Sequence, residues 1–382
     1  MQYHPSRRQF LATSASLPIL TRLGSPARST SSKTLLVLGG TRFLGPAVVD
    51  AALERGYEVT LFNRGRSNPH LYPDLEKLRG DRDTGDLDAL KGRSFDVVVD
   101  TSAYLPAHAR AVGEILAENV GHYVVISTCS VYAQGEEQIV TEDSPVMSIS
   151  DEDIDKVKRI GDVYRVGGGQ YYGPLKVLCE RALEELMPGR VTSLRPGVIA
   201  GRDDPSDRLP YWVVRPTQGG EVLVPNVPDL GIQFTDVRDL GEFSVDFAEQ
   251  RKAGIFNSIG FKDTLTLKEL VHACRDVMEV ECSFTWVDED FLLERQVRPF
   301  VELPFWLPAP YARRFENKKG LAAGMRFRPI SETIRETADW HFEERGADYR
   351  WRTYGMQPER EKALLEEWHA RDAVEETAGE PK

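Results

Sequence analysis

Short, continuous apolar runs alternate along this chain with longer stretches in which apolar residues recur at the spacing of an amphipathic helix. Apolar runs with the length of a buried strand occupy residues 34–38, 58–62, 96–100, 123–126 and 191–194. Stretches with helical spacing occupy residues 46–53, 107–116 and 172–183. Because a helix between two strands carries the chain back across the sheet, this alternation predicts an α/β fold with a doubly wound parallel sheet of the Rossmann type.

The alternation of strands and helices ends near Gly201, and the sequence beyond that residue has a different composition. Acidic residues and proline are dense at 203–207, and tryptophan recurs further along. We therefore assign residues 33–201 and 233–260 to the sheet domain, 202–232 and 261–345 to a smaller C-terminal substrate lobe, and 346–382 to a helical tail.

A glycine-rich turn joins the first predicted strand to the first predicted helix. Small residues let the backbone approach a pyrophosphate, and the N-terminus of a helix offers free N–H groups to the anion. A plain tight turn is the alternative interpretation, but the flanking strand and helix favour a dinucleotide site. The residues that we expect to contact the cofactor here are Gly39, Thr41, Arg42, Phe43, Leu44 and Gly45.

A tyrosine and a lysine four residues apart open the helical stretch at 172–183. Tyr172 and Lys176 share one face of a helix, and an ammonium group near a phenol favours the phenolate and lowers the pKa of the tyrosine. Tyr172 is therefore a candidate general acid and base, unless the pair is simply exposed on an ordinary helix. Pro174 lacks an N–H donor, so the helix must begin near Tyr172.

Together with these two motifs, four further segments resemble, in the same order, the extended short-chain dehydrogenase/reductase superfamily and its NAD(P)-dependent epimerase/dehydratase group. They occupy residues 123–132, 194–201, 234–240 and 256–260. The resemblance runs from about residue 34 to residue 341 and implies a dinucleotide-dependent enzyme, which in this superfamily often forms a homodimer.

The resemblance also implies a role for each of five residues. Thr128 and Tyr172 would hydrogen-bond the same substrate oxygen, with Tyr172 moving its proton. Lys176 would hold the nicotinamide ribose and depress the pKa of the tyrosine. Pro196 and Val198 would lie beside the nicotinamide.

The end of the second predicted strand bears on the choice of cofactor. An acidic residue there would bind the ribose hydroxyls and indicate NAD, but this chain has Asn63. Arg64 and Arg66 follow and can pair with a 2′-phosphate, assisted by Arg42. We therefore predict NADP, with NAD as the alternative, unless these are solvated loop arginines. In the resemblance Asp81 contacts the adenine, although it also suits a turn.

Departures from the family narrow the expected reaction. Dehydratases of the family place Asp and Glu directly after the catalytic Thr, whereas Cys129 and Ser130 stand there in this chain. We therefore expect an epimerase-like oxidoreductase that acts on a secondary alcohol or carbonyl of a sugar or sugar nucleotide. Arginines that could bind a phosphate are Arg202, Arg208 and Arg238.

Two other functions stay open. One is an NADP-dependent reductase of a non-sugar carbonyl. The other is a non-catalytic RNA-binding protein of the chloroplast stem-loop-binding type, which shares the Gly-Gly-Thr-Arg-Phe turn but generally lacks the Tyr/Lys pair.

Charge and composition bear on the possible partners. The net charge is −12, and there is no long run of Lys and Arg, so binding to nucleic acid or to an anionic membrane has little electrostatic support. No apolar run is long enough to span a bilayer. The four cysteines lack metal-type spacing, so we predict no metal site.

The N-terminal 32 residues have the character of a targeting segment. The motif resembles a twin-arginine export signal and reads Ser6-Arg7-Arg8-Gln9-Phe10-Leu11. We therefore expect export from the cytoplasm, with a disordered tail on a cytoplasmic protein as the alternative. Since an exported enzyme has no dinucleotide pool to recycle its cofactor, export would favour a redox-neutral epimerisation over net reduction.

Overall fold

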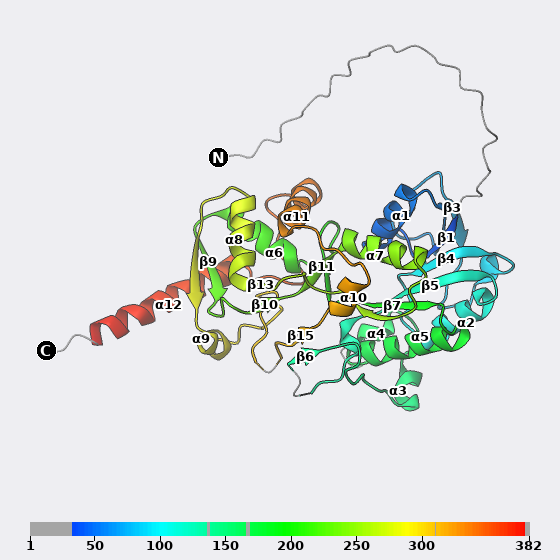
Figure 1. Cartoon of the computed structure of the whole chain (residues 1–382). Coiled ribbons are helices and arrows are strands. Elements are labelled where there is room, and N and C mark those ends of the chain that lie inside the picture. Colours follow the sequence, from blue (N-terminus) through cyan, green and yellow to red (C-terminus); the bar gives the residue numbers. More distant parts are fainter. Residues whose placement is uncertain (1–32, 136–137, 166–168, 310, 379–382) are drawn as a thin grey trace, which may run out of the picture. The chain divides into compact units, whose positions relative to one another are not determined.

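A computed structural model of the chain describes residues 33–135, 138–165, 169–309 and 311–378, so the predicted export signal lies outside the described residues. Its central feature is a seven-stranded parallel sheet with the order β12-β7-β5-β4-β1-β2-β3 (Figure 1). The strands are β1 (Thr34–Leu38), β2 (Glu58–Asn63), β3 (Glu76–Arg79), β4 (Phe95–Asp100), β5 (Val120–Ile126), β7 (Val191–Arg195) and β12 (Gly254–Asn257). The expected α/β fold of the Rossmann type is confirmed.

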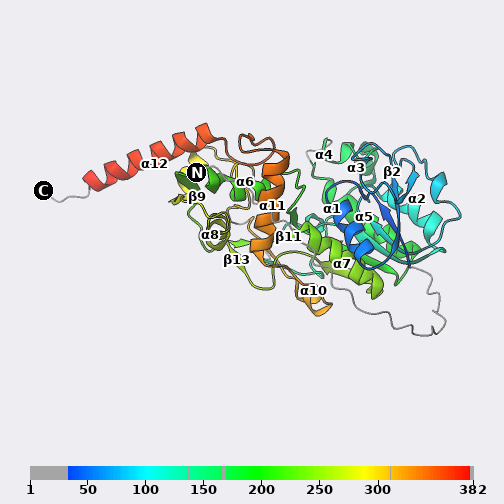
Figure 2. The same ribbon diagram turned by 90° about the horizontal axis from the view of Figure 1, so that it is seen from above.

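Two pairs of helices cover the two faces of this sheet (Figures 1 and 2): α1 (Leu44–Glu54) with α7 (Val237–Glu249), and α2 (Pro106–Leu116) with α5 (Tyr172–Leu186). Successive side chains of a strand point to opposite faces. Leu35 and Val37 of β1 therefore pack in the core under α1 and α7, while Leu36 and Leu38 pack under α2 and α5. Burial on both faces explains why the strands read as continuous apolar runs.

The edge strand β3 was not predicted. Its sequence is Glu-Lys-Leu-Arg, and none of its four side chains is fully buried. Charged residues are typical of edge strands, which must avoid pairing with other chains, and they hide the apolar pattern on which the prediction depended. The strand matters for function because it leads into the loop at residues 80–86.

A second hydrophobic core fills the C-terminal lobe. Trp212 and Trp306 are fully buried there, and Trp351, Leu365 and Trp368 of the predicted tail pack into the same core. The main elements of the lobe are α6 (Arg208–Val214), β9 (Glu221–Pro225), α8 (Leu267–Val277), β14 (Ser283–Val287), α9 (Glu289–Glu294), α11 (Ile330–Glu344) and α12 (Pro358–Ala378). Among the described residues, no helix combines the length and apolarity needed to cross a membrane.

Short elements complete the described chain. The short strands are β6 (Ile139–Val140), β8 (Val198–Ala200), β10 (Gly231–Ile232), β11 (Phe234–Asp236), β13 (Leu265–Thr266) and β15 (Arg314–Phe315). The short helices are α3 (Asp151–Lys156), α4 (Asp162–Arg165), α10 (Lys318–Ala322) and the 3-10 turns η1 (Asp88–Leu90), η2 (Cys129–Val131) and η4 (Arg215–Gln218).

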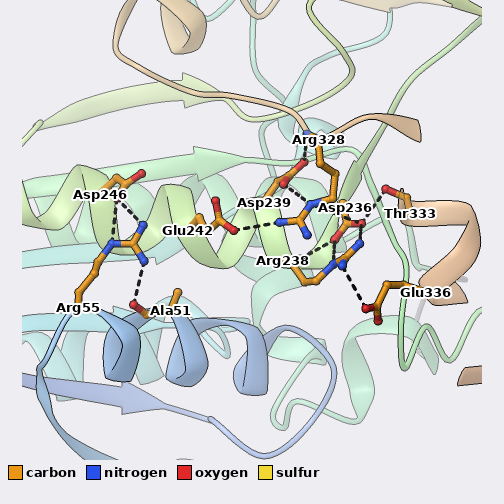
Figure 3. A network of polar contacts seen from close by, with 10 residues as sticks. All are labelled: Ala51, Arg55, Asp236, Arg238, Asp239, Glu242, Asp246, Arg328, Thr333 and Glu336. Carbon is orange, nitrogen blue, oxygen red and sulfur yellow. Dashed lines mark hydrogen bonds and ion pairs between the residues drawn. The ribbon is translucent and has the colours of Figure 1, made fainter. Parts of the chain in front are cut away.

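Polar contacts on α7 join the lobe to the sheet domain (Figure 3). Arg328, just before α11, donates from Nε to Asp239 Oδ1 at 2.5 Å and from Nη2 to Glu242 at 2.9 Å. Thr333 of α11 donates its hydroxyl to Asp236 Oδ2 at 2.7 Å. Since Asp236 also accepts the N–H of Arg238 and caps α7, one carboxylate fixes both the helix and the lobe.

The variant Arg328→Met tests this link. It leaves the largely buried Asp239 carboxylate without its charge partner, so we expect the free energy of unfolding in urea to fall by about 3 kcal/mol. The matched control is Arg350→Met, which removes an exposed partner of Glu359 and should leave the free energy of unfolding almost unchanged. Equal losses in the two variants would show that the Arg328 contacts do not hold the lobe.

Candidate active site

The glycine turn after β1 has the close packing that a dinucleotide site requires. Gly39 has φ +119°, and a Cβ atom added there would lie 2.3 Å from the hydroxyl oxygen of Thr101. A Cβ atom on Gly45 would lie 2.7 Å from the backbone of Gly40. Both positions therefore admit only glycine, and the backbone surface they leave bare is the kind of cradle that fits a pyrophosphate.

No side chain caps the N-terminus of α1 at this turn, although the N–H of Gly45 donates to the carbonyl of Arg42 at 3.0 Å. Phe43 occupies the cap position with φ 48° and offers no side-chain hydrogen bond, and the first turn holds no acidic residue. These features suit an anion at the helix N-terminus. Of the other predicted residues, Leu44 is packed in the core beneath the turn, Arg42 is exposed, and Thr41 is buried with its carbonyl accepting from Asn68 Nδ2 at 2.9 Å.

Asn63 uses its side chain to hold the loop. Its Nδ2 donates to the carbonyl of Gly39 at 3.2 Å, and its Oδ1 accepts from the N–H of Gly65 at 2.8 Å and from Arg79. Arg64 and Arg66 lie on the same loop and are exposed. Their nearest acidic partners are distant, with Arg64 at 3.9 Å from Asp83 and Arg66 at 3.8 Å from Asp81. Such long, exposed pairs leave both guanidinium groups available to an anion.

The loop that follows β3 is closed on itself. Asp81 and Asp86 exchange two backbone hydrogen bonds of 3.0 Å, and the Asp81 carboxylate accepts the N–H of Asp83 at 3.0 Å. A Cβ atom on Gly80 would lie 2.3 Å from the carbonyl of Asp86 and 2.5 Å from the ring of Phe62. Asp81 is thus a turn residue in this structure, at the place where the resemblance expects the adenine.

Thr128 and Tyr172 meet at the wall of one cavity. Thr128 follows β5 and caps η2, with its Oγ1 accepting from the N–H of Ser130 at 3.1 Å. Tyr172 is the first residue of α5, as Pro174 predicted, and both it and Thr128 line the cavity, where Thr128 acts on the phenol in the direction that lowers its pKa. Val198 also lines this cavity, whereas Pro196 is buried and its carbonyl accepts from the N–H of Cys129 at 2.7 Å.

Lys176 does not pair with Tyr172. Its Nζ donates to the carbonyl of Ala103 at 2.7 Å and to that of Ile126 at 2.5 Å, and it lies 5.2 Å from the ring centroid of Tyr104. Burial lowers the pKa of Lys176. The expected lowering of the tyrosine pKa is wrong for this structure: burial first, then Tyr164 and Tyr104, raise the pKa of Tyr172 well above its ordinary value.

The cavity itself has a volume of about 760 Å³ and lies between the sheet domain and lobe residues of the same compact unit. Three of its lining residues are arginines, namely Arg208, Arg313 and Arg314, and Asp263 is the acidic residue among the described lining residues. Of these arginines, the sequence pointed only to Arg208, because residues 313 and 314 belong to no motif. Arg202 and Arg238 pair with Asp203 and Asp236 and do not line the cavity.

Apolar and aromatic side chains cover much of the rest of the cavity. They include Phe261, Phe300, Phe305, Leu307 and Tyr311. These residues come from distant parts of the lobe, so no local pattern in the sequence indicated that they meet. A ring with an apolar face and an attached anion would match both kinds of lining.

Sequence comparisons place this site in a known context. The model of the NAD dependent epimerase/dehydratase family matches residues 35–258. The chloroplast stem-loop binding protein of 41 kDa b of Arabidopsis thaliana is 26% identical over 268 residues, which are 64% of this chain and 63% of that protein. A 3 beta-hydroxysteroid dehydrogenase/Delta 5→4-isomerase of Mycobacterium tuberculosis is 33% identical over 87 residues, 23% of this chain and 24% of that protein. The chain thus spans less than two thirds of the length of these curated relatives.

Solved structures share the fold. A putative epimerase from Burkholderia cenocepacia superposes with a TM-score of 0.60 at 18% identity, covering 81% of this chain and 97% of that one. WbmH of Bordetella bronchiseptica, solved in complex with NAD+, gives 0.57 at 18% identity, covering 82% and 99%. A UDP-glucose 4-epimerase gives 0.59 at 15% identity, covering 84% and 100%. At these identities the likeness supports the Rossmann-type fold and no more.

The raised pKa of Tyr172 can be measured without any substrate. Because burial keeps this phenol protonated, the folded protein and its Tyr172→Phe variant should show the same phenolate absorbance through about pH 10, the ordinary range of tyrosine. In denaturant the two should differ by one tyrosine, which provides the control. A one-tyrosine difference that develops below about pH 9 in the folded protein would contradict the burial argument.

Proposed function

The chain belongs to the NAD dependent epimerase/dehydratase family, and we propose that it is an epimerase-like oxidoreductase of a sugar or sugar nucleotide. The reacting group would be a secondary alcohol or a carbonyl. One observation carries the proposal: Thr128 and Tyr172 line the wall of the same large cavity. The family is NAD-dependent, and the uncapped helix and glycine turn fit that cofactor.

The residues of the site divide the work between them. A bound dinucleotide supplies the hydride acceptor and donor. The turn at Gly39 and Gly45 and the N-terminus of α1 would hold its pyrophosphate. An ammonium group has three N–H donors, and Lys176 gives two of them to Ala103 and Ile126, which leaves one for a ribose hydroxyl.

Tyr172 would hold the proton that the substrate exchanges. Its raised pKa keeps the phenol protonated near neutral pH, so it is set to donate to a substrate carbonyl oxygen. Thr128 would hydrogen-bond the same oxygen and fix its position, because its side chain lines the same cavity as Tyr172. In the opposite direction Tyr172, as the phenolate left after it has given up its proton, would take the proton of a secondary alcohol held at the same place.

The charge of the cavity supports an anionic substrate. The chain carries a net charge of −12, yet three arginines and one aspartate line this cavity. A local excess of positive charge in an acidic protein attracts anions selectively. The phosphates of a sugar nucleotide fit this charge, and a UDP-glucose 4-epimerase is among the structural neighbours.

An RNA-binding function is the second candidate, and the likeness to the chloroplast stem-loop binding protein favours it. Two features weigh against it. The net charge of −12 opposes a polyanion, and Lys176 is buried against two backbone carbonyls, where it offers no surface charge to RNA. Filter binding of a stem-loop RNA under salt titration would detect this function directly.

Turnover of UDP-glucose tests the proposed function. We expect NMR to show conversion to an epimer while the absorbance of reduced dinucleotide stays constant. Tyr172→Phe should slow turnover at least about 100-fold, because it removes the proton carrier. Tyr171→Phe is the matched control, since its hydroxyl bonds Asp153 outside the site and its loss should leave turnover unchanged. If reduced dinucleotide is consumed stoichiometrically with a carbonyl compound, the protein is a reductase.

Cofactor choice is tested at the loop after β2, where we propose that Arg64 and Arg66 bind the 2′-phosphate of NADP. Calorimetry should give a dissociation constant for NADP that rises at least about tenfold in the double variant Arg64→Ala/Arg66→Ala, while that for NAD stays the same, since each exposed guanidinium lost is a phosphate partner. Arg93→Ala, which removes an exposed partner of Glu76 on β3, is the control. Wild-type protein that binds NAD tenfold tighter, a difference of about 1.4 kcal/mol, would refute the proposal.

A further inference from the structure

The last residue of β4 and the three residues that follow it contact three separate parts of the proposed dinucleotide site. They are Asp100 at the end of the strand, then Thr101, Ser102 and Ala103. One contact runs to the loop at residues 80–86, one to the end of β1, and one to the catalytic helix α5. No motif in the sequence pointed to this segment.

Asp100 makes the first contact through a buried ion pair. Its Oδ1 accepts from Arg82 Nη2 at 3.0 Å and its Oδ2 from Arg82 Nη1 at 3.0 Å, so the pair is bidentate. Tyr123 donates its hydroxyl to Oδ2 at 2.8 Å, and the N–H of Ser102 donates to Oδ1 at 2.9 Å. Asp100 is fully buried and Arg82 is 8% exposed. Each carboxylate oxygen of Asp100 therefore accepts two hydrogen bonds.

The next three residues make the other contacts. The hydroxyl groups of Thr101 and Ser102 both donate to the carbonyl of Leu38, at 3.0 and 3.2 Å, directly before Gly39. The carbonyl of Ala103 accepts from Lys176 at 2.7 Å. The position of Asp100 along the sheet thus sets the positions of the glycine turn and of the lysine as well.

The stability of the folded protein does not by itself account for a buried ion pair of this kind. Taking two charges out of water costs several kcal/mol each, and replacing such a pair with apolar residues is often neutral or stabilising. What the pair adds is direction, because a guanidinium fork meets a carboxylate in one geometry only. Arg82 lies in a loop that Asp81 and Asp86 close, and Asp83 of this loop also accepts the N–H of Ile160 at 2.9 Å; the fork adds the contact that fixes the loop against β4.

We propose that Arg82 and Asp100 are positioning residues for the dinucleotide: they hold the loop at 80–86 in the place that its adenylate half requires. Neither side chain contacts the cofactor. The inference rests on the dinucleotide binding put forward under the proposed function. Under this proposal, loss of the pair lowers the affinity for the cofactor but leaves the fold of the protein intact.

The triple variant Arg82→Met/Asp100→Leu/Tyr123→Phe tests this expectation. It replaces the pair by apolar side chains, and the added substitution Tyr123→Phe removes the buried hydroxyl that would lose its acceptor, so the urea midpoint of the ligand-free protein should stay close to that of wild type. Calorimetry should show dissociation constants for NAD and for AMP that rise at least tenfold. The control Arg93→Met/Glu76→Leu removes an exposed ion pair at the adjacent edge strand and should leave both constants unchanged.

A second variant guards against failure of the first to fold. Arg82→Lys keeps the charge but cannot form the fork, and we expect at least a threefold loss of AMP affinity from it. Wild-type affinity for AMP in either folded variant would overturn the positioning role alone. Wild-type protein that binds neither NAD nor NADP would overturn the proposed function together with it.

Discussion

The contact between the ends of β1 and β4 is the constraint on which the site depends. The residue after β1 must be glycine, because Thr101 occupies the space that a side chain at Gly39 would need. Thr101 is held there by its hydrogen bond to the carbonyl of Leu38. These two strands are neighbours in the sheet although 62 residues separate Thr34 from Asp96 in the chain. The strand order reverses at this pair, and in such sheets the crevice at the reversal is where ligands bind.

Burial accounts for the electrostatics of the catalytic residues. Lys176 is almost wholly out of water, and its ammonium group is compensated by two backbone carbonyls rather than by the phenol of Tyr172. Tyr104 contacts both side chains, with ring centroids 6.2 Å from Tyr172. The lysine therefore acts on the site by fixing the backbone at Ala103 and Ile126. Spacing on a helix brings two residues to one face, but neighbouring carbonyls decide which groups then pair.

Local patterns in the sequence predicted what is local in the structure. The strand, turn and helix around Gly39 follow from adjacent residues, and the start of α5 follows from Pro174. The pair of Arg82 and Asp100 could not be predicted, because it needs both the register of the charged edge strand β3 on β2 and the place of β4 beside β1. The cavity lining is beyond prediction for the same reason, since Phe300 and Arg313 meet Thr128 only after the lobe has folded.

The contacts that attach the lobe to α7 relate the cavity to the glycine turn of the sheet domain. The cavity takes the hydroxyls of Thr128 and Tyr172 from the sheet domain and its arginines from the lobe. The charged contacts between Arg328 and α7 tie the lobe to the helix that packs against α1. The glycine turn lies at the N-terminus of α1. The packing of α1 against α7 therefore relates this turn to the arginine-lined wall of the cavity. A shift of α7 would therefore alter the distance between the arginine-lined wall of the cavity and the glycine turn, while each of the two kept its own geometry.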